Sequence, residues 1–278
     1  MRNSIQLPLI FATALLALGV QAAGVPLAVA PASAALLPQD GGDEVVVEDK
    51  REVVKELIGT FEDHTKKKGE EDVEAIKVMD QLLAEFTESG PKDRASIVKA
   101  LEKALLLPRK DSDEGVKEAR LATAAAVCLG EMAPESVKPL IAATSGKKLR
   151  DNLDLLRRTT IALGKTKDGR AVKPLLSLMS DKMPIVQGAG IEALGEFREL
   201  DQKVRKDIVE ELLKLIMPIK STVDTDPSDT ITREQYDVIG PPTITTLQRL
   251  TDQDMRDLVE WQQWWNNNKR ADWDSEDN

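Results

Sequence analysis

Cysteine, histidine and aromatic residues are scarce in this 278-residue sequence. The single cysteine, Cys128, excludes an intramolecular disulfide, so packing alone must stabilise the fold. Aromatic residues make up 3% of the sequence, which argues against a β-sandwich, because strands favour aromatic and β-branched residues. A core built from Leu, Ile, Val and Ala suits closely stacked helices better.

The scarcity of histidine limits the chemistry that we expect. The one histidine, His64, stands beside a lysine run near a predicted helix end and is expected to be a solvated surface residue. Neither Cys128 nor any serine stands in a recognisable nucleophile motif. The sequence therefore predicts no catalytic residue, no metal site and no cofactor, and we expect a protein that is not an enzyme.

An excess of positive charge is also lacking. The formal net charge is -10, so the molecule as a whole would repel a phosphate backbone. We therefore expect no nucleic-acid partner.

The amino terminus has the features of an export signal. Arg2 precedes an apolar run, and small residues of the kind found at cleavage sites end at Ala22 and again at Ala34. We predict a signal peptide over residues 1–22, cleaved after Ala22 or after Ala34, and a disordered Ala/Pro-rich leader over 23–44. An uncleaved membrane anchor is the alternative, although proline and glutamine interrupt the apolar stretch. The protein is expected to be exported to the periplasm or extracellular space of a bacterium, without a stable membrane span after signal removal.

Apolar residues recur at helical spacing from Val45 onward. Three such stripes, in residues 53–61, 73–86 and 97–105, are followed by a lysine run, a Gly-Pro pair and a proline, respectively. No segment sustains the alternation with a period of two that marks a strand. The sequence therefore predicts an all-α protein.

Two short motifs repeat in the middle of the chain. Leu-Gly pairs close successive Ala-rich helices and end at Gly130, Gly164 and Gly195. The tetrapeptide Val-Lys-Pro-Leu occurs at 137–140 and again at 172–175. This spacing fits units of two antiparallel helices with short turns. Because one unit cannot bury its apolar face alone, we predict a right-handed α-solenoid of stacked antiparallel helix pairs over residues 45–220.

These repeats resemble short HEAT-type repeats, of the form also seen in phycobiliprotein lyases. The likeness rests on Val-x-Pro-Leu-Leu in the first helix and Ala-Leu-Gly at the end of the second, and it covers residues 116–197. It implies a helical solenoid. One departure stands at Val186-Gln187, where short HEAT units often carry Val-Arg and use the arginine in a ladder between repeats.

Two glycines and the cysteine occupy predicted helix interiors. Gly188 and Gly190 each cost about 1 kcal/mol relative to alanine there, so we expect them to let a neighbouring helix approach closely. A ligand lying against the bare backbone is the alternative. Cys128 aligns with Ala162 and Ala193, which precede the next two Leu-Gly pairs, and is expected to be a small core residue with an inert thiol.

Residues 221–230 are expected to form a polar loop after the repeats. Asp224, Asp226 and Asp229 could face a calcium ion, although the segment lacks the glycine turn and the terminal glutamate of an EF-hand loop. The alternative is a surface turn in which Asp or Ser caps the next helix.

All four tryptophans lie in the carboxy-terminal segment 231–278, which is expected to hold further helices and an acidic tail. Asp257, followed three residues later by glutamate, is typical of a capping box, so a short helix should begin there. Two interpretations stay open. Trp261, Trp264 and Trp265 cap the last repeat unit, or they form an exposed aromatic platform that binds a glycan or a partner protein.

The same segment carries Leu-Thr-x-x-Asp before Trp-x-x-Trp-Trp, which resembles the ending of secreted bacterial HEAT-repeat proteins of undefined function. Together with the repeats, it leads us to expect a non-catalytic scaffold or adaptor that binds another protein in the bacterial envelope. The alternatives are a lyase-type enzyme or enzyme subunit on a HEAT scaffold, and a carbohydrate-binding module that uses the tryptophans.

Overall fold

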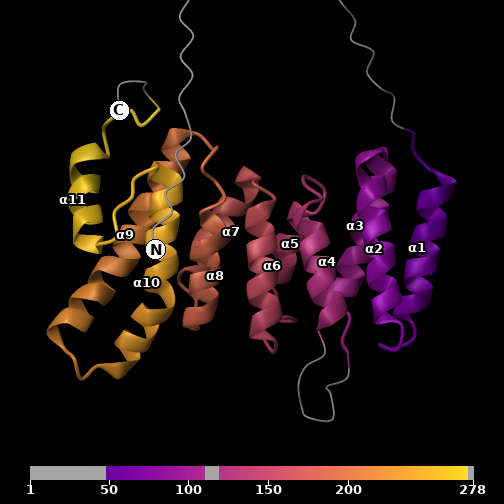
Figure 1. Ribbon diagram of the computed structural model, residues 1–278, viewed down its shortest axis with the longest axis horizontal. Helices are drawn as coiled ribbons and strands as arrows, with labels where there is room; N and C mark the ends of the chain where they lie inside the picture. The colour runs from indigo at the N-terminus through magenta and orange to yellow at the C-terminus, as the bar shows by residue number, and fades with distance from the viewer. Residues whose placement is uncertain (1–47, 110–118, 275–278) are drawn as a thin grey trace, which may run out of the picture. The chain divides into compact units, whose positions relative to one another are not determined.

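The computed structural model describes residues 48–109 and 119–274 (Figure 1). These residues form eleven α-helices and one short 3-10 helix, with no β-strand among them, which confirms the all-α prediction. The helices are α1 (Glu52–Thr65), α2 (Asp72–Thr87), α3 (Pro91–Leu105), α4 (Arg120–Gly130), α5 (Val137–Ser145), α6 (Leu153–Lys165), η1 (Gly169–Ala171), α7 (Val172–Leu178), α8 (Pro184–Leu194), α9 (Gln202–Thr225), α10 (Thr230–Thr251) and α11 (Leu258–Asn268).

The predicted signal peptide, the leader and the alternative membrane anchor all lie outside the described residues. Of the helices that the structure does describe, none combines the length and the apolar character needed to cross a membrane.

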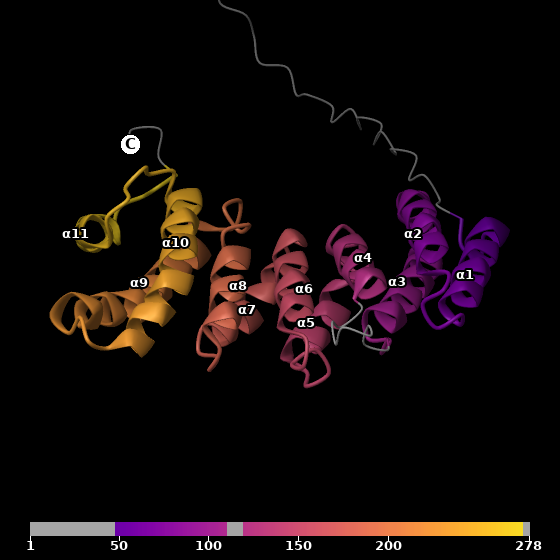
Figure 2. The same ribbon diagram turned by 60° about the horizontal axis from the view of Figure 1, so that its bottom comes forward.

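The helices pack against one another in chain order. Helix α1 packs on α2, and the even-numbered helices α2, α4, α6, α8 and α10 then contact one another in succession (Figures 1 and 2). Helices α3, α5, α7 and α9 pack against α4, α6, α8 and α10, respectively, and α11 packs against α9. We call the five even-numbered helices α2 to α10 the even row.

The Leu-Gly pairs lie where consecutive helices of the even row touch. A Cβ atom added at Gly164 would lie 2.6 Å from the carbonyl oxygen of Ala193, and one added at Gly130 would lie 3.1 Å from the carbonyl oxygen of Ala162. Each of these alanines belongs to the Ala-Leu-Gly motif of the following unit. The missing side chain of one unit therefore admits the backbone of the next, and repeating the motif repeats this contact.

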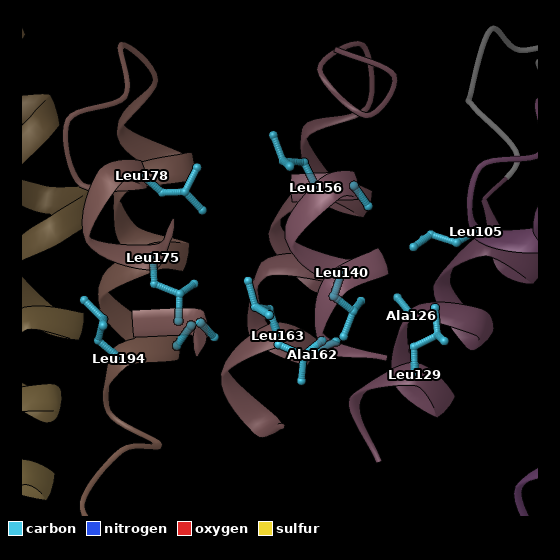
Figure 3. Close-up of a cluster of buried hydrophobic side chains, with 14 of the residues drawn as sticks. Leu105, Ala126, Leu129, Leu140, Leu156, Ala162, Leu163, Leu175, Leu178 and Leu194 are labelled. Atoms are coloured by element: carbon cyan, nitrogen blue, oxygen red, sulfur yellow. The ribbon is translucent and has the colours of Figure 1, made fainter. Parts of the chain in front are cut away.

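The leucines of the same motifs form the core between units. Leu129, Leu163 and Leu194 are fully buried, and Figure 3 shows them at matching ends of their helices. Leu156 and Leu178 lie toward the opposite end of the same cluster (Figure 3). Burying a leucine side chain contributes about 1.5–3 kcal/mol, so these positions stabilise the stacking as well as each helix pair.

The glycines inside α8 also have close neighbours. A Cβ atom added at Gly190 would lie 3.1 Å from the carbonyl oxygen of Leu175 and from Cβ of Leu178, both in α7. The predicted close approach of a helix is therefore confirmed at Gly190. At Gly188 the added atom would make only an ordinary contact, 3.5 Å from the carbonyl oxygen of Val238 in α10.

The predicted polar loop over 221–230 is wrong in its first half. Helix α9 continues to Thr225 and α10 begins at Thr230, which leaves only a short connection between them. The buried side chain of Val223 extends the apolar face of α9 into the polar segment. The hydroxyl of Thr225 also donates to the carbonyl oxygen of Ser221 at 2.8 Å, so polar side chains here bond within the helix.

A buried hydroxyl just before α5 lacks a partner among the described residues. Ser136 is 0% exposed, and its Oγ accepts and donates no hydrogen bond there. The equivalent position of the next unit, also directly before Val-Lys-Pro-Leu, is the fully buried Ala171. The repeat itself therefore indicates which residue fits this position best.

We expect Ser136→Ala to raise the free energy of unfolding by about 1 kcal/mol, because it removes a buried polar group that stays unpaired. Urea unfolding measures the change, with Ser145→Ala at an exposed position as the control. A clear loss of stability in Ser136→Ala would show that the hydroxyl is satisfied in solution.

Candidate functional site

Helix α11 carries the three tryptophans that the sequence singles out. It begins at Leu258, and the side chain of Asp257 accepts hydrogen bonds from two backbone amides of its first turn, which confirms the predicted helix start. Trp261 is 0% exposed, and its indole Nε1 donates to the carbonyl oxygen of Met255 at 3.1 Å. The first of the three candidate binding residues is therefore fully buried, with its polar atom hydrogen-bonded.

The other tryptophans gather around Trp261. Trp265 is 8% exposed, whereas Trp264 and Trp273 are half-buried. The ring centroids of Trp261 and Trp264 lie 5.7 Å apart in an edge-on arrangement, and those of Trp264 and Trp273 lie 5.3 Å apart. An aromatic platform needs exposed ring faces. Of the three predicted candidates only Trp264 keeps a partly exposed ring, and the other two belong to the core.

A buried arginine holds the last described residues in place, and the sequence did not predict it. Arg205 of α9 is 8% exposed. Its Nε donates to the carbonyl oxygen of Leu200 at 3.1 Å and its Nη1 to that of Leu250 at 3.1 Å. Its Nη2 pairs with Asp274, and its guanidinium carbon lies 5.9 Å from the ring centroid of Trp273. No local pattern marks this residue, because most of its partners are distant in sequence.

The three aspartates considered for a cation are engaged separately. Asp224 pairs with Lys220 at 2.7 Å, and Asp226 accepts from the amide two residues further on at 3.0 Å. Asp229 accepts from an amide of the first turn of α10 at 3.0 Å, which confirms the alternative that an aspartate caps this helix. Within residues 48–109 and 119–274, no group of three or more His, Cys, Asp or Glu converges on a possible metal position.

Cys128 lies in the core, as predicted. It is 6% exposed in α4, and burial raises the pKa of its thiol to about 11, with the charges of Asp80 and Glu131 acting in the same direction. Ala162 and Ala193 at the equivalent positions each meet a glycine of the preceding helix. Helix α2, which precedes α4 in the even row, contains no glycine, so the Gly-to-Ala contact of the later units is not repeated at Cys128.

We expect Cys128 to react with iodoacetamide about 100-fold more slowly in the folded than in the urea-unfolded protein near neutral pH, because a higher pKa lowers the thiolate fraction. The unfolded thiol ionises first, so the free energy of unfolding should fall as the pH rises from 9.0 toward about 11. Timed labelling with mass spectrometry measures the rate, and Cys128→Ala should lose this part of the pH dependence. Equal labelling rates in the two states would contradict the burial.

His64 is half-buried rather than fully solvated, which corrects the prediction. Its Nδ1 lies 2.8 Å from Glu71 Oε2. The turn between α1 and α2 folds back and brings the carboxylate beside the ring. This contact joins two neighbouring helices and involves no serine or cysteine.

The exposed surface of the even row is the remaining candidate. Large apolar side chains are exposed on four of its five helices, and they are Val73, Val127, Ile185, Ile231 and Val238. Single exposed apolar residues are ordinary, but groups of them mark interaction surfaces. The arrangement can bind another macromolecule through an extended surface built from successive helices.

A scan against protein-family models, a search of the curated proteins and a search of the solved structures each found no match to this chain.

Proposed function

We propose that this protein is a right-handed, HEAT-like α-solenoid that serves as a non-catalytic scaffold or adaptor for another protein in the bacterial envelope. The observation that carries the proposal is the even row, in which five helices follow one another and the same Gly-to-Ala contact recurs between units. Stacked repeats of this kind create extended surfaces that suit protein partners. The exposed apolar side chains on four of these helices support the same use.

Export to the envelope is part of the proposal. It rests on the positively charged start, the apolar run and the small-residue cleavage patterns within residues 1–34. Protease protection of the full chain in intact cells, compared with cells whose outer layer is permeabilised, tests this part separately from partner binding.

Photo-crosslinking in the native cell tests the scaffold function. A photoreactive phenylalanine analogue is placed at Val127, which is 50% exposed, or at Val73, which is 49% exposed, in the full chain. We expect each of these positions to crosslink to a discrete partner protein. The same analogue at exposed Glu56 of α1, outside the even row, is the control. The absence of any crosslinked protein from both positions would refute the proposal.

The two alternatives receive less support. The lyase-type enzyme rests on family resemblance, and fold analogy does not carry an activity. A carbohydrate-binding module would use Trp261 and Trp265, and both rings are buried.

A further inference from the structure

A chain of polar contacts joins the segments at one end of three successive units. Arg150, in the connection before α6, pairs with Asp181, in the connection before α8. The carbonyl oxygen of Asp181 accepts from Gln187 Nε2 at 2.8 Å, and Gln187 Oε1 accepts from Gln235 Nε2 of α10 at 2.9 Å. Gln187 stands where short HEAT repeats often carry arginine, and here it is 6% exposed and links α8 to α10. These contacts place the four segments along one continuous edge.

The carboxylate of Asp181 fixes the geometry of this edge. Burial acts to raise the pKa of this carboxyl, but hydrogen bonds from the amide of Met183 and from Arg150 hold the pKa below its usual value. The amide of Met183 donates to Asp181 Oδ1 at 3.0 Å. The connection before α8 is thus held in one conformation by a carboxylate that stays charged near neutral pH.

Four large apolar side chains are exposed along the edge. Met183 is 43% exposed, Ile185 38%, Ile231 80% and Val238 42%, and together they are four of the eight large apolar residues exposed in the described part of the chain. Ile231 and Val238 are four and three residues from Gln235, so they share its side of α10. The hydrogen bond between Gln187 and Gln235, together with the ordinary contact of Val238 at Gly188, places this side of α10 next to α8. Apolar residues grouped in this way are typical of an interaction surface.

Unpaired positive charge lies beside these apolar residues. Lys147, Lys148 and Lys182 are exposed in the connections before α6 and α8, and none of them makes an ion pair within the described residues. From Lys138 to Lys182 the sequence contains eleven Lys and Arg but four Asp and Glu, in a protein with a net charge of -10. The lysine side of the edge is therefore a basic region in an acidic molecule.

The α10 part of the edge carries negative charge. Glu234 and Asp237 are exposed on α10, between Ile231 and Val238 in the sequence. Residues 183–274 as a whole contain eighteen Asp and Glu but eleven Lys and Arg. A ligand that is acidic along its whole length would be attracted by the three lysines and repelled by the acidic residues of 183–274. This charge distribution argues against a long polyanion such as a nucleic acid.

We infer that this edge, made by Lys147, Lys148, Lys182, Met183, Ile185, Ile231 and Val238, binds a short segment of a partner protein in which acidic residues stand next to apolar ones. The acidic residues of the segment face the three lysines, and its apolar residues cover the four apolar side chains. Glu234 and Asp237 set the direction of the segment by excluding its acidic end. The inference rests on the proposed function and specifies its surface and the chemistry of its partner.

A library of displayed random peptides of about 12 residues, selected on the immobilised full chain, tests the inference. We expect enriched peptides to combine acidic and apolar residues, and their affinity to fall as the salt concentration rises. Fluorescence anisotropy then compares the wild type with an edge variant, Lys182→Glu with Ile185→Ser and Ile231→Ser. A matched control variant, Lys99→Glu with Val53→Ser and Val259→Ser, makes the same kinds of change at exposed residues outside the even row.

The edge variant is expected to bind the enriched peptides at least about tenfold more weakly, and the control variant to bind them like the wild type. All substitutions lie at exposed positions, and thermal unfolding verifies that both variants fold. Enriched peptides without acidic residues, or equal binding by the edge variant, would overturn the inference. A concentration-dependent dimer that only the edge variant loses would also overturn it, because the occupant of the edge would then be a second copy of this chain. Binding of a single-stranded oligonucleotide that depends on the edge would overturn it as well.

The outcomes for the two proposals are distinct. If a partner crosslinked in cells is captured equally by the edge variant, the scaffold function stands and the assignment of the edge is wrong. If no protein is crosslinked to the even row, the scaffold function itself is wrong, and the inference that rests on it falls as well.

Discussion

Gly164→Ala is expected to lower the free energy of unfolding by about 3 kcal/mol, although alanine is the better helix former by about 1 kcal/mol. The added Cβ would lie 2.6 Å from the carbonyl oxygen of Ala193 and 2.8 Å from its Cα. Both neighbours belong to the backbone of α8, so no side-chain rotation can relieve the overlap. Either α6 and α8 move apart or the contact between two units is lost, and urea unfolding measures the result.

Substitutions of two further glycines serve as comparisons for Gly164→Ala. Gly130→Ala should lose less, about 1 kcal/mol, because its nearest contact would be 3.1 Å. Gly59→Ala, on the exposed side of α1 with nothing within 4 Å, should gain stability up to about 1 kcal/mol. If all three substitutions stabilised the protein alike, helix propensity alone would account for them, and the proposed role of Leu-Gly in stacking would be wrong.

Trp261→Ala is expected to lower the free energy of unfolding by about 3–5 kcal/mol, because it leaves a large cavity between α11 and the core. The ring is 0% exposed, and the substitution also leaves the carbonyl oxygen of Met255 without the donor that it has at 3.1 Å. The aromatic contact with Trp264 disappears as well. Urea unfolding followed by far-ultraviolet circular dichroism measures the change without relying on the altered fluorescence.

Trp264→Ala is the matched control on the same helix. Its ring is half-buried, so we expect a smaller loss, about 1 kcal/mol. A loss below about 1 kcal/mol in Trp261→Ala would contradict its burial and would reopen the platform interpretation. A large loss would leave the tryptophans as a structural element and would direct the search for partners to the even row.

These predictions show how the repeats and the carboxy-terminal segment differ. Between the units, stability depends on how closely backbones approach, and a single methyl group is decisive. At α11, stability depends on how much aromatic surface is buried, because Trp261 and Trp265 are buried where α11 packs against α9, and Trp273 lies beside Arg205 of α9. The chain thus uses two kinds of packing. Between the units an added methyl group destabilises the fold, whereas at α11 the removal of an aromatic ring does so.

Local chemistry decides most of what could be predicted correctly from the sequence. The stripes of apolar residues in 53–61, 73–86 and 97–105 became α1, α2 and α3, since a helical period of burial requires a helix. Asp257 began α11, because a capping side chain needs only the backbone amides next to it. Cys128 was a core residue because it occupies a repeated position whose other members are alanines.

Errors arose where the outcome depends on contacts that the residue types alone do not specify. The polar side chains of residues 221–225 led to the prediction of a loop. The packing of Val223 and the hydrogen bonds within α9 keep these residues helical. His64 was expected to be solvated, but the turn after α1 brings Glu71 Oε2 to 2.8 Å from its Nδ1. In both cases the residue type was compatible with two environments, and tertiary contacts selected one of them.

The amino-acid sequence by itself determined the helical class, the repeated unit and the positions of its glycines, because periodicity and side-chain size act over a few residues. Only the tertiary structure decided that Trp261 and Trp265 are buried, that Arg205 pairs with Asp274, and that Arg150, Asp181, Gln187 and Gln235 join the connections before α6 and α8 to α10. These features join residues tens of positions apart, and no local pattern encodes which of them will meet.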